Sequence, residues 1–120
     1  MTYGQIKDVK ERIHLASTDT SRDDQIQRAL NQADALIDLD LSQYVSVPLI
    51  SGISNVIVDV ANDWAAGLVQ QEIINPTSQG TGEENIFVKR AKEHLAKYIE
   101  VSFRDTSAGA MYEQSVDMDE

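Results

Sequence analysis

Residues 54–69 read SNVIVDVANDWAAGLV and are the most apolar helix-forming segment of the chain. Apolar residues recur there at spacings of three and four, the pattern of one wide face of an α-helix. The face comprises Ile53, Val56, Ile57, Val60, Ala61, Trp64 and Leu68. We therefore predict a central helix, with Trp64 in the core because large aromatic side chains dominate burial. The small residues 65–67 leave room for another backbone to approach closely.

The segment before this helix, SQYVSVPLISGIS at residues 42–54, is mostly apolar although it contains two strong helix breakers, Pro48 and Gly52. Pro48 has a fixed φ and biases the residue before it towards extended backbone. The apolar side chains need cover, so we predict a buried corner that sets the angle between two long helices. Ser51 or Ser54 is then the expected N-cap of the central helix.

Three further apolar stripes at helical spacing flank these segments. The first comprises Ile6, Val9 and Ile13, the second Ile26, Ala29, Leu30, Ala33, Ile37 and Leu41, and the third Val88, Ala91, Leu95, Tyr98 and Ser102. The stripes predict an all-α chain in which residues 1–104 form a four-helix bundle-like domain.

Capping residues and breakers give the expected ends of these helices. Thr20 or Ser21 is the expected N-cap of the second helix, because either hydroxyl can accept a hydrogen bond from a free backbone N–H. Pro76 stops the central helix, and a Gly-rich loop at 75–84 leads to a last helix that begins near residue 83 or 84.

Residues 105–120 are predicted to be an extended acidic C-terminal tail. They contain five acids and no base, so this segment carries half of the net charge of −10. Its apolar residues are Met111, Tyr112, Val116 and Met118. We expect contact with partner chains to hold the tail in order, with packing against its own domain as the alternative.

The composition excludes several classes of protein. At 120 residues the chain has the length of one domain, and it lacks the cysteine needed for disulfides, thiolate chemistry or cysteine–metal sites. No segment approaches the roughly 18–20 apolar residues of a membrane span, and the charged N-terminal residues are unlike a signal peptide, so we expect no membrane partner. Twenty acids against ten bases leave no basic footprint for tight nucleic-acid binding. Solubility or adaptation to high salt would each account for the excess of acidic residues.

The sequence lacks patterns that indicate catalysis or metal binding. Neither His14 nor His94 has metal-ligand spacing, and both are expected at the surface. DLDLSQY at 38–44 lacks the glycine and the glutamate of a calcium loop, and GTGEEN at 80–85 lacks the lysine of a phosphate-binding loop. We therefore expect no enzyme activity, no catalytic residue, no metal ligand and no cofactor.

One basic cluster is a candidate partner surface. Lys89, Arg90, Lys92 and Lys97 place four of the ten bases on the last helix. They form either a solvated face balanced by nearby glutamates or a surface that receives an acidic segment, such as the tail of another copy. These four bases and the four apolar tail residues are the predicted interface residues.

The order of the segments resembles a known family. TYGQIKDVKERI leads through a polar loop to DDQIQRALNQADALID, and an aromatic followed by Pro-Leu, in YVSVPL, precedes SNVIVDVANDWAAGLV and a last helix, FVKRAKEHLAKYIE. Over residues 2–102 this order is similar to that of the head–tail connector proteins, also called head-completion or adaptor proteins, of tailed phages and viruses. The family-like positions are Tyr44, Pro48, Leu49 and Trp64, and the tail has no counterpart.

The resemblance implies a structural virion protein at the head–tail junction, made in the host cytoplasm. Copies would form a ring, usually a dodecamer, below the portal protein, extend its DNA channel, and offer a platform for a stopper or tail-completion protein. DNA would pass through without specific binding. The candidate channel-facing acids are Asp34, Asp38, Asp59 and Asp63, of which the first two are expected on the solvated side of their helix.

A function from another class is also compatible with the acidic charge. The chain could be a soluble acidic regulator, such as a DNA-mimic inhibitor that binds another protein. This alternative accounts for the charge and the helices but not for the apolar segment at residues 42–54.

Overall fold

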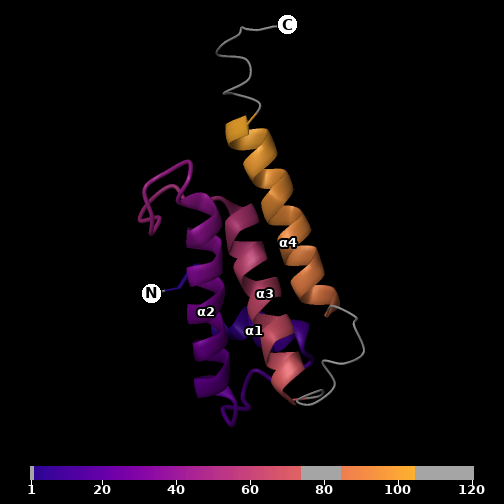
Figure 1. Ribbon diagram of the computed structural model, residues 1–120. Coiled ribbons are helices and arrows are strands. Elements are labelled where there is room, and N and C mark those ends of the chain that lie inside the picture. Colours follow the sequence, from indigo (N-terminus) through magenta and orange to yellow (C-terminus); the bar gives the residue numbers. More distant parts are fainter. Residues whose placement is uncertain (1, 74–84, 105–120) are drawn as a thin grey trace, which may run out of the picture.

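The structure is a computed structural model that describes residues 2–73 and 85–104 (Figure 1). These residues form α1 (Ile6–Arg12), α2 (Asp23–Leu41), α3 (Asn55–Ile73) and α4 (Ile86–Ile99), and a π-helical turn (Glu100–Arg104) continues α4. The described part of the chain contains no strand. The predicted all-α, four-helix bundle-like fold is confirmed.

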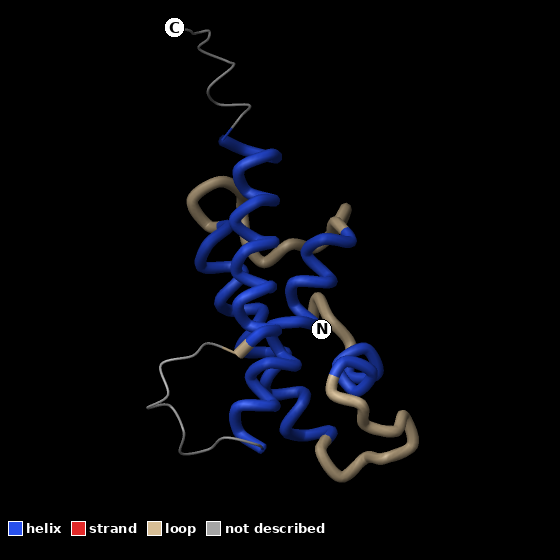
Figure 2. Tube along the Cα trace, turned by 90° about the vertical axis from the view of Figure 1, so that its right-hand side faces the viewer, coloured by secondary structure: helices blue, strands red, loops and turns tan. Residues whose placement is uncertain are grey.

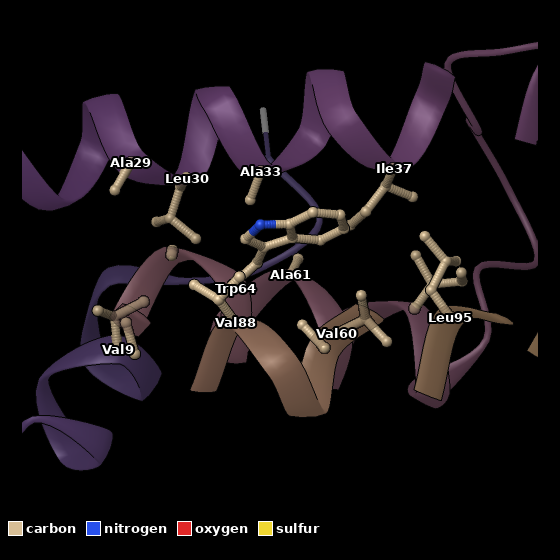
Figure 3. Packing of buried hydrophobic residues seen from close by; sticks show 14 of the residues in the cluster. Val9, Ala29, Leu30, Ala33, Ile37, Val60, Ala61, Trp64, Val88 and Leu95 are labelled. Atoms are coloured by element: carbon tan, nitrogen blue, oxygen red, sulfur yellow. The ribbon is translucent and has the colours of Figure 1, made fainter. Parts of the chain in front are cut away.

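α3 is the central helix, as its apolar sequence predicts. It packs against α1, α2 and α4, and it lies between α2 and α4 in the ribbon (Figure 1). Trp64 is 6% exposed, and its indole faces α2 between Ala33 and Ile37 (Figure 3). The prediction of a buried Trp64 is confirmed. At the N-terminal end of α3, Val56 is 40% exposed, so the predicted apolar face is left uncovered there.

The apolar stripe of α2 is buried along its whole length. All six of its predicted core residues are at most 5% exposed: Ile26, Ala29, Leu30, Ala33, Ile37 and Leu41. On α4, Val88, Ala91 and Leu95 are buried as predicted. The prediction that Ser102 completes this stripe is wrong, because Ile99, four residues after Leu95, is buried instead and Ser102 is exposed.

The caps of α2 and α4 differ from the expected ones. α2 begins at Asp23 without a side-chain cap, because the hydroxyl of Ser21 donates a hydrogen bond to Asp19 Oδ1 at 2.6 Å. α4 begins later than expected, at Ile86, where the Asn85 side chain accepts hydrogen bonds from two backbone N–H groups. At α3 the expected cap is confirmed, since Ser54 Oγ accepts a hydrogen bond from the next-but-one N–H at 3.1 Å.

The hinge, residues 42–54, is only partly the buried corner that its composition predicts. It runs across the end of the molecule where α2 finishes and α3 starts (Figure 2). Four of its side chains pack against the core: Val45, Val47, Leu49 and Ile53. Tyr44 and Ile50, however, are 40% and 89% exposed. The described helices therefore cover one side of the hinge and leave the other side apolar and open.

Two backbone features shape the hinge. The peptide bond between Val47 and Pro48 is cis, a form that is essentially confined to bonds before proline. Gly52 has a φ of +62°, where a residue with a Cβ is strained. Both helix breakers identified in the sequence therefore occupy positions that suit them.

At Gly67, α3 and α4 pack so closely that a side chain would not fit. A Cβ at this position would lie 2.5 Å from Val88 Cγ2 and 2.9 Å from the Val88 backbone nitrogen. Because one of these atoms belongs to the backbone, the neighbour cannot simply rotate away. The room predicted at residues 65–67 is thus used by the first turn of α4.

The substitution Gly67→Ala is expected to lower the free energy of unfolding by about 1–3 kcal/mol through overpacking. Helix propensity alone predicts the opposite sign, because alanine in a helix interior is about 1 kcal/mol more favourable than glycine. Urea unfolding measures the difference, with Gln71→Ala as the control at an exposed position of the same helix. A stabilised Gly67→Ala variant would contradict the close packing of α3 and α4.

Candidate functional site

A buried carboxylate joins α1, α3 and α4. The side chain of Asp63 on α3 is only 5% exposed. Its Oδ1 accepts hydrogen bonds from Arg12 Nε of α1 at 2.7 Å and from an Arg90 terminal nitrogen of α4 at 3.0 Å. Its Oδ2 accepts a hydrogen bond from Arg90 Nε at 3.0 Å, so Arg90 binds in the bidentate manner that is strongest for this pair of groups.

The charge state of this ion cluster follows from its partners. Burial by itself would raise the pKa of Asp63, but the hydrogen bonds and charges of Arg90 and Arg12 outweigh burial and hold the pKa below its ordinary value. The hydrogen bond to Asp63 in turn raises the pKa of Arg90. A carboxylate that stays ionised and has both oxygens occupied is unsuited to proton transfer near neutral pH. The cluster therefore serves to join helices.

A second constellation, the N-terminal latch, consists of Tyr3, Asp34, Asp38 and Leu49. The Tyr3 hydroxyl donates to Asp38 Oδ1 at 2.6 Å and accepts a hydrogen bond from the Leu49 N–H at 2.8 Å. The Tyr3 N–H donates to both carboxylate oxygens of Asp34 at 3.2 Å. The latch thus ties the N-terminal segment, α2 and the hinge together at one point.

Burial in the latch changes two pKa values. It raises the pKa of Asp34 to about 6, because burial disfavours its charged form and the neighbouring Asp38 adds like-charge repulsion. Burial and the hydrogen bond to Asp38 raise the pKa of Tyr3 to about 12. Tyr3 is therefore a hydrogen-bond donor at all ordinary pH values, whereas Asp34 titrates near pH 6.

The N-terminal segment has a further anchor on α3. Asn62 is 1% exposed, and its Oδ1 accepts a hydrogen bond from the Gln5 N–H at 2.9 Å. A Cβ at Gly4 would collide with the Asn62 amide and with Leu30. The chain therefore needs glycine at this point in order to reach both α2 and α3.

An open groove with an apolar floor lies between the N-terminal end of α3 and the C-terminal half of α4. Its volume is about 490 Å³, and its lining residues are Val56, Asp59, His94, Lys97, Tyr98, Val101 and Ser102. Val101 is 55% exposed and Val56 is 40% exposed, so both side chains remain partly uncovered. Close by, Phe103 stacks on Tyr44 of the hinge with ring centroids 5.3 Å apart. Phe103 also meets Tyr98, one of the groove residues, edge-on, so aromatic contacts connect the hinge to the groove at this end of the molecule.

The structure places the four candidate channel-facing acids in different surroundings. Asp63 is buried in the ion cluster, so it cannot face a channel. Asp34 and Asp38 are half-buried and accept hydrogen bonds from Tyr3, so they are not freely solvated as expected. Asp59 has a side chain that is 66% exposed and lies 3.7 Å from the Arg12 guanidinium. For Asp34, Asp38 and Asp59 the channel-facing role stays a prediction.

The basic cluster on α4 is divided by its contacts. Arg90 points at Asp63 and lies over the Phe87 ring, with its guanidinium carbon 5.0 Å from the ring centroid. Lys97 Nζ lies 3.7 Å from Glu100, and Lys97 also lines the groove. Lys89 and Lys92 are exposed. Of the four bases, Arg90 is therefore the least suited to an interface role, because its charge is already paired with Asp63.

The family-like hinge and core positions play different roles. Trp64 is core, Pro48 forms the cis bond, and Leu49 packs against the core while its N–H binds Tyr3. Tyr44 stacks on Phe103. The tail positions Met111, Tyr112, Val116 and Met118 lie outside the described residues.

Sequence reasoning missed Tyr3, Arg12, Asn62 and Phe103. Three of these residues act through partners that are 46 to 57 positions away in the chain. A signal was present for Asn62 and Asp63, since both interrupt the apolar helix next to Trp64. Polar residues inside a buried helix require hydrogen-bond partners, and that requirement could have pointed to the arginines.

The comparisons with known proteins give no relative: no family model, curated protein or solved structure matches the chain. Among residues 2–73 and 85–104 no group of three or more His, Asp or Glu side chains could hold a metal ion. No helix of that part is long and apolar enough to cross a membrane.

The substitution Asp63→Asn is expected to lower the free energy of unfolding by about 2–4 kcal/mol, because Arg12 and Arg90 lose their charged partner in a partly buried setting. The matched control is Asp59→Asn, one turn away on the same helix and largely exposed, with an expected loss of at most about 0.5 kcal/mol. Urea unfolding compares the two variants. Equal effects would contradict the role of the buried ion cluster.

The substitution Asp34→Asn is expected to flatten the pH dependence of stability. The folded-state pKa of about 6 lies above the ordinary value of about 4, so the folded protein binds this proton more tightly than the unfolded chain. The contribution of Asp34 to the free energy of unfolding is therefore greatest below about pH 4 and is lost as the pH rises through 6. Asparagine cannot ionise but retains an oxygen that can accept the Tyr3 N–H.

Thermal unfolding at about pH 4.5 and about pH 7.5 tests this expectation. The gain in Tm of Asp34→Asn over the unsubstituted protein should be larger at the higher pH. Asp40→Asn removes an exposed carboxylate from the same helix and serves as the control. A gain that is the same at both pH values would show that Asp34 is not the group that titrates.

Proposed function

We propose that this chain is a structural subunit of a ring at the head–tail junction of a tailed virus, where it links the portal protein to the tail and extends the DNA channel. The observation that carries the proposal is the apolar surface at the hinge end of the fold. Tyr44, Val56 and Val101 are 40–55% exposed there, beside an open groove. Exposed contiguous apolar surfaces mark protein–protein interaction sites in soluble proteins.

The order of the segments supports the same proposal. A short N-terminal helix, a long polar-faced helix, an aromatic and Pro-Leu hinge, a buried helix and a last basic helix follow each other as the resemblance to connector proteins implies. The net charge of −10 would disfavour adsorption of DNA to the subunit. Neither the order of the segments nor the net charge requires a catalytic group.

The alternative, an acidic regulator that mimics DNA, has less support. A DNA mimic needs its carboxylates on the surface, where a DNA-binding protein can reach them. Asp63 is buried against two arginines, and Asp34 and Asp38 accept hydrogen bonds from Tyr3. These acids therefore act within the chain itself.

Native mass spectrometry and negative-stain electron microscopy test the proposed function on the purified chain, alone and with the portal protein encoded by the same genome. We expect closed rings, of about twelve copies, that bind the portal. Val56→Asp should weaken ring formation or portal binding about tenfold or more, because it places a charge in the apolar surface. Leu39→Asp is the control, since Leu39 is 68% exposed on α2 and does not line the groove.

Two results would overturn the proposal. One is a chain that neither forms rings nor binds the portal protein under any condition. The other is recovery of a DNA-binding enzyme as the main partner in a pull-down with the full chain, which would favour the regulator.

A further inference from the structure

The groove beside α4 has no covering element in the described part of the chain, although its chemistry is that of a peptide-binding site. Val56, Tyr98 and Val101 provide apolar surface, and the lining also contains Asp59 on the α3 side and Lys97, which lies 3.7 Å from Glu100, on the α4 side. A volume of about 490 Å³ is within the range of sites that take a few side chains. The question is which segment has matching chemistry.

Charge distinguishes residues 85–104 from the rest of the chain taken together. Residues 85–104 contain five bases and two acids, whereas the other residues contain five bases and eighteen acids. An acidic segment is therefore attracted to residues 85–104 and repelled by the rest of the chain taken as a whole. The segment with the opposite character is 105–120, which has five acids, no base and four large apolar residues.

We propose that the groove receives the acidic C-terminal segment, residues 105–120, of a second copy of the chain. Met111 and Tyr112 fit the apolar floor by their chemistry, and the carboxylates around them fit the α4 side of the groove, where Lys97 lies. The apolar contacts supply affinity and the charges supply orientation. If every copy donates its segment to the next copy, the contact is heterologous and can close into a ring.

The direction of α4 favours binding of residues 105–120 in the groove of another copy over binding in the groove of the same copy. The last turns of α4 project beyond the neighbouring ends of α2 and α3 (Figure 1). Val101 and Ser102 line the groove, and Arg104 follows two residues later, so the chain leaves the groove at its far end. To bind its own groove, the segment must reverse direction before Met111. Donation to a neighbour needs no reversal.

This inference rests on the proposed function only in that copies of the chain associate. Its test contains no portal protein, so failure here leaves the portal test standing. The probe is Val101→p-benzoylphenylalanine in the full chain, mixed with an equal amount of ¹⁵N-labelled unsubstituted full chain and irradiated. Because 105–120 contains no Lys or Arg, trypsin releases the segment after Arg104 as one peptide, whose isotope reports the copy that donated it.

The expected result is a cross-link from position 101 to the ¹⁵N-labelled peptide 105–120. The double substitution Met111→Ser, Tyr112→Ser in the labelled chain should reduce this cross-link about tenfold or more, because two apolar contacts are removed. Leu39→p-benzoylphenylalanine, at an exposed apolar position outside the groove, should give no cross-link to this peptide.

Three results would overturn the proposal. A cross-link to the unlabelled peptide 105–120 alone would show that the segment binds its own groove. A cross-link to any other segment would show a different occupant. No cross-link at concentrations at which the chain associates would show that association does not use the groove.

Discussion

The carboxylate of Asp63 is the point at which α1, α3 and α4 are joined, and the arrangement of the described fold depends on it. α1 has seven residues, too few for a helix that is stable alone. Apolar contacts are non-directional, whereas a bidentate Arg90 and a second arginine, Arg12, fix how their helices lie on α3. The two positive charges also keep the buried carboxylate ionised. Close packing at Gly67 then brings the start of α4 against the same face.

The apolar surface at the hinge end follows from where the covering elements stop. The N-terminal latch reaches across from Tyr3 to the Leu49 N–H, and the core of the described helices covers one side of the hinge. On the other side, Phe103 of the π-helical turn reaches Tyr44 but leaves it 40% exposed. No described helix passes beyond that pair, so Val101 and Ile50 stay exposed. The open surface is therefore a consequence of the geometry of the hinge and not of an unusual composition.

Helical periodicity predicted most of the apolar faces, apart from Val56 and Ser102, but not the polar contacts. The six buried residues of α2 and the core position of Trp64 follow from spacing and size alone. The same rule placed Asp34 and Asp38 on the solvated side of their helix, where they instead accept hydrogen bonds from Tyr3, and it gave no sign that Asp63 is buried. The partners of Asp63 lie 27 and 51 positions away in the sequence, and the partner of Asp34 lies 31 positions away. A pattern within one helix carries no information about contacts between residues so far apart in the chain. The caps failed for a local reason: Ser21 has a competing partner in Asp19, and Asn85 is a stronger cap than the residues before it.

The charge that the fold presents at its surface differs from the net charge of the sequence, because some acids form ion pairs inside the fold. Several acids are used inside the fold, as Asp63 and Asp23 pair with arginine and lysine side chains. The remaining surface is acidic except along α4, so copies repel each other unless the positive helix faces a negative segment. Salt screens this repulsion and also the attraction, whereas apolar contacts at the hinge end are not screened. In the association that we propose, the apolar surface therefore supplies the strength, and the charge pattern decides only which faces meet.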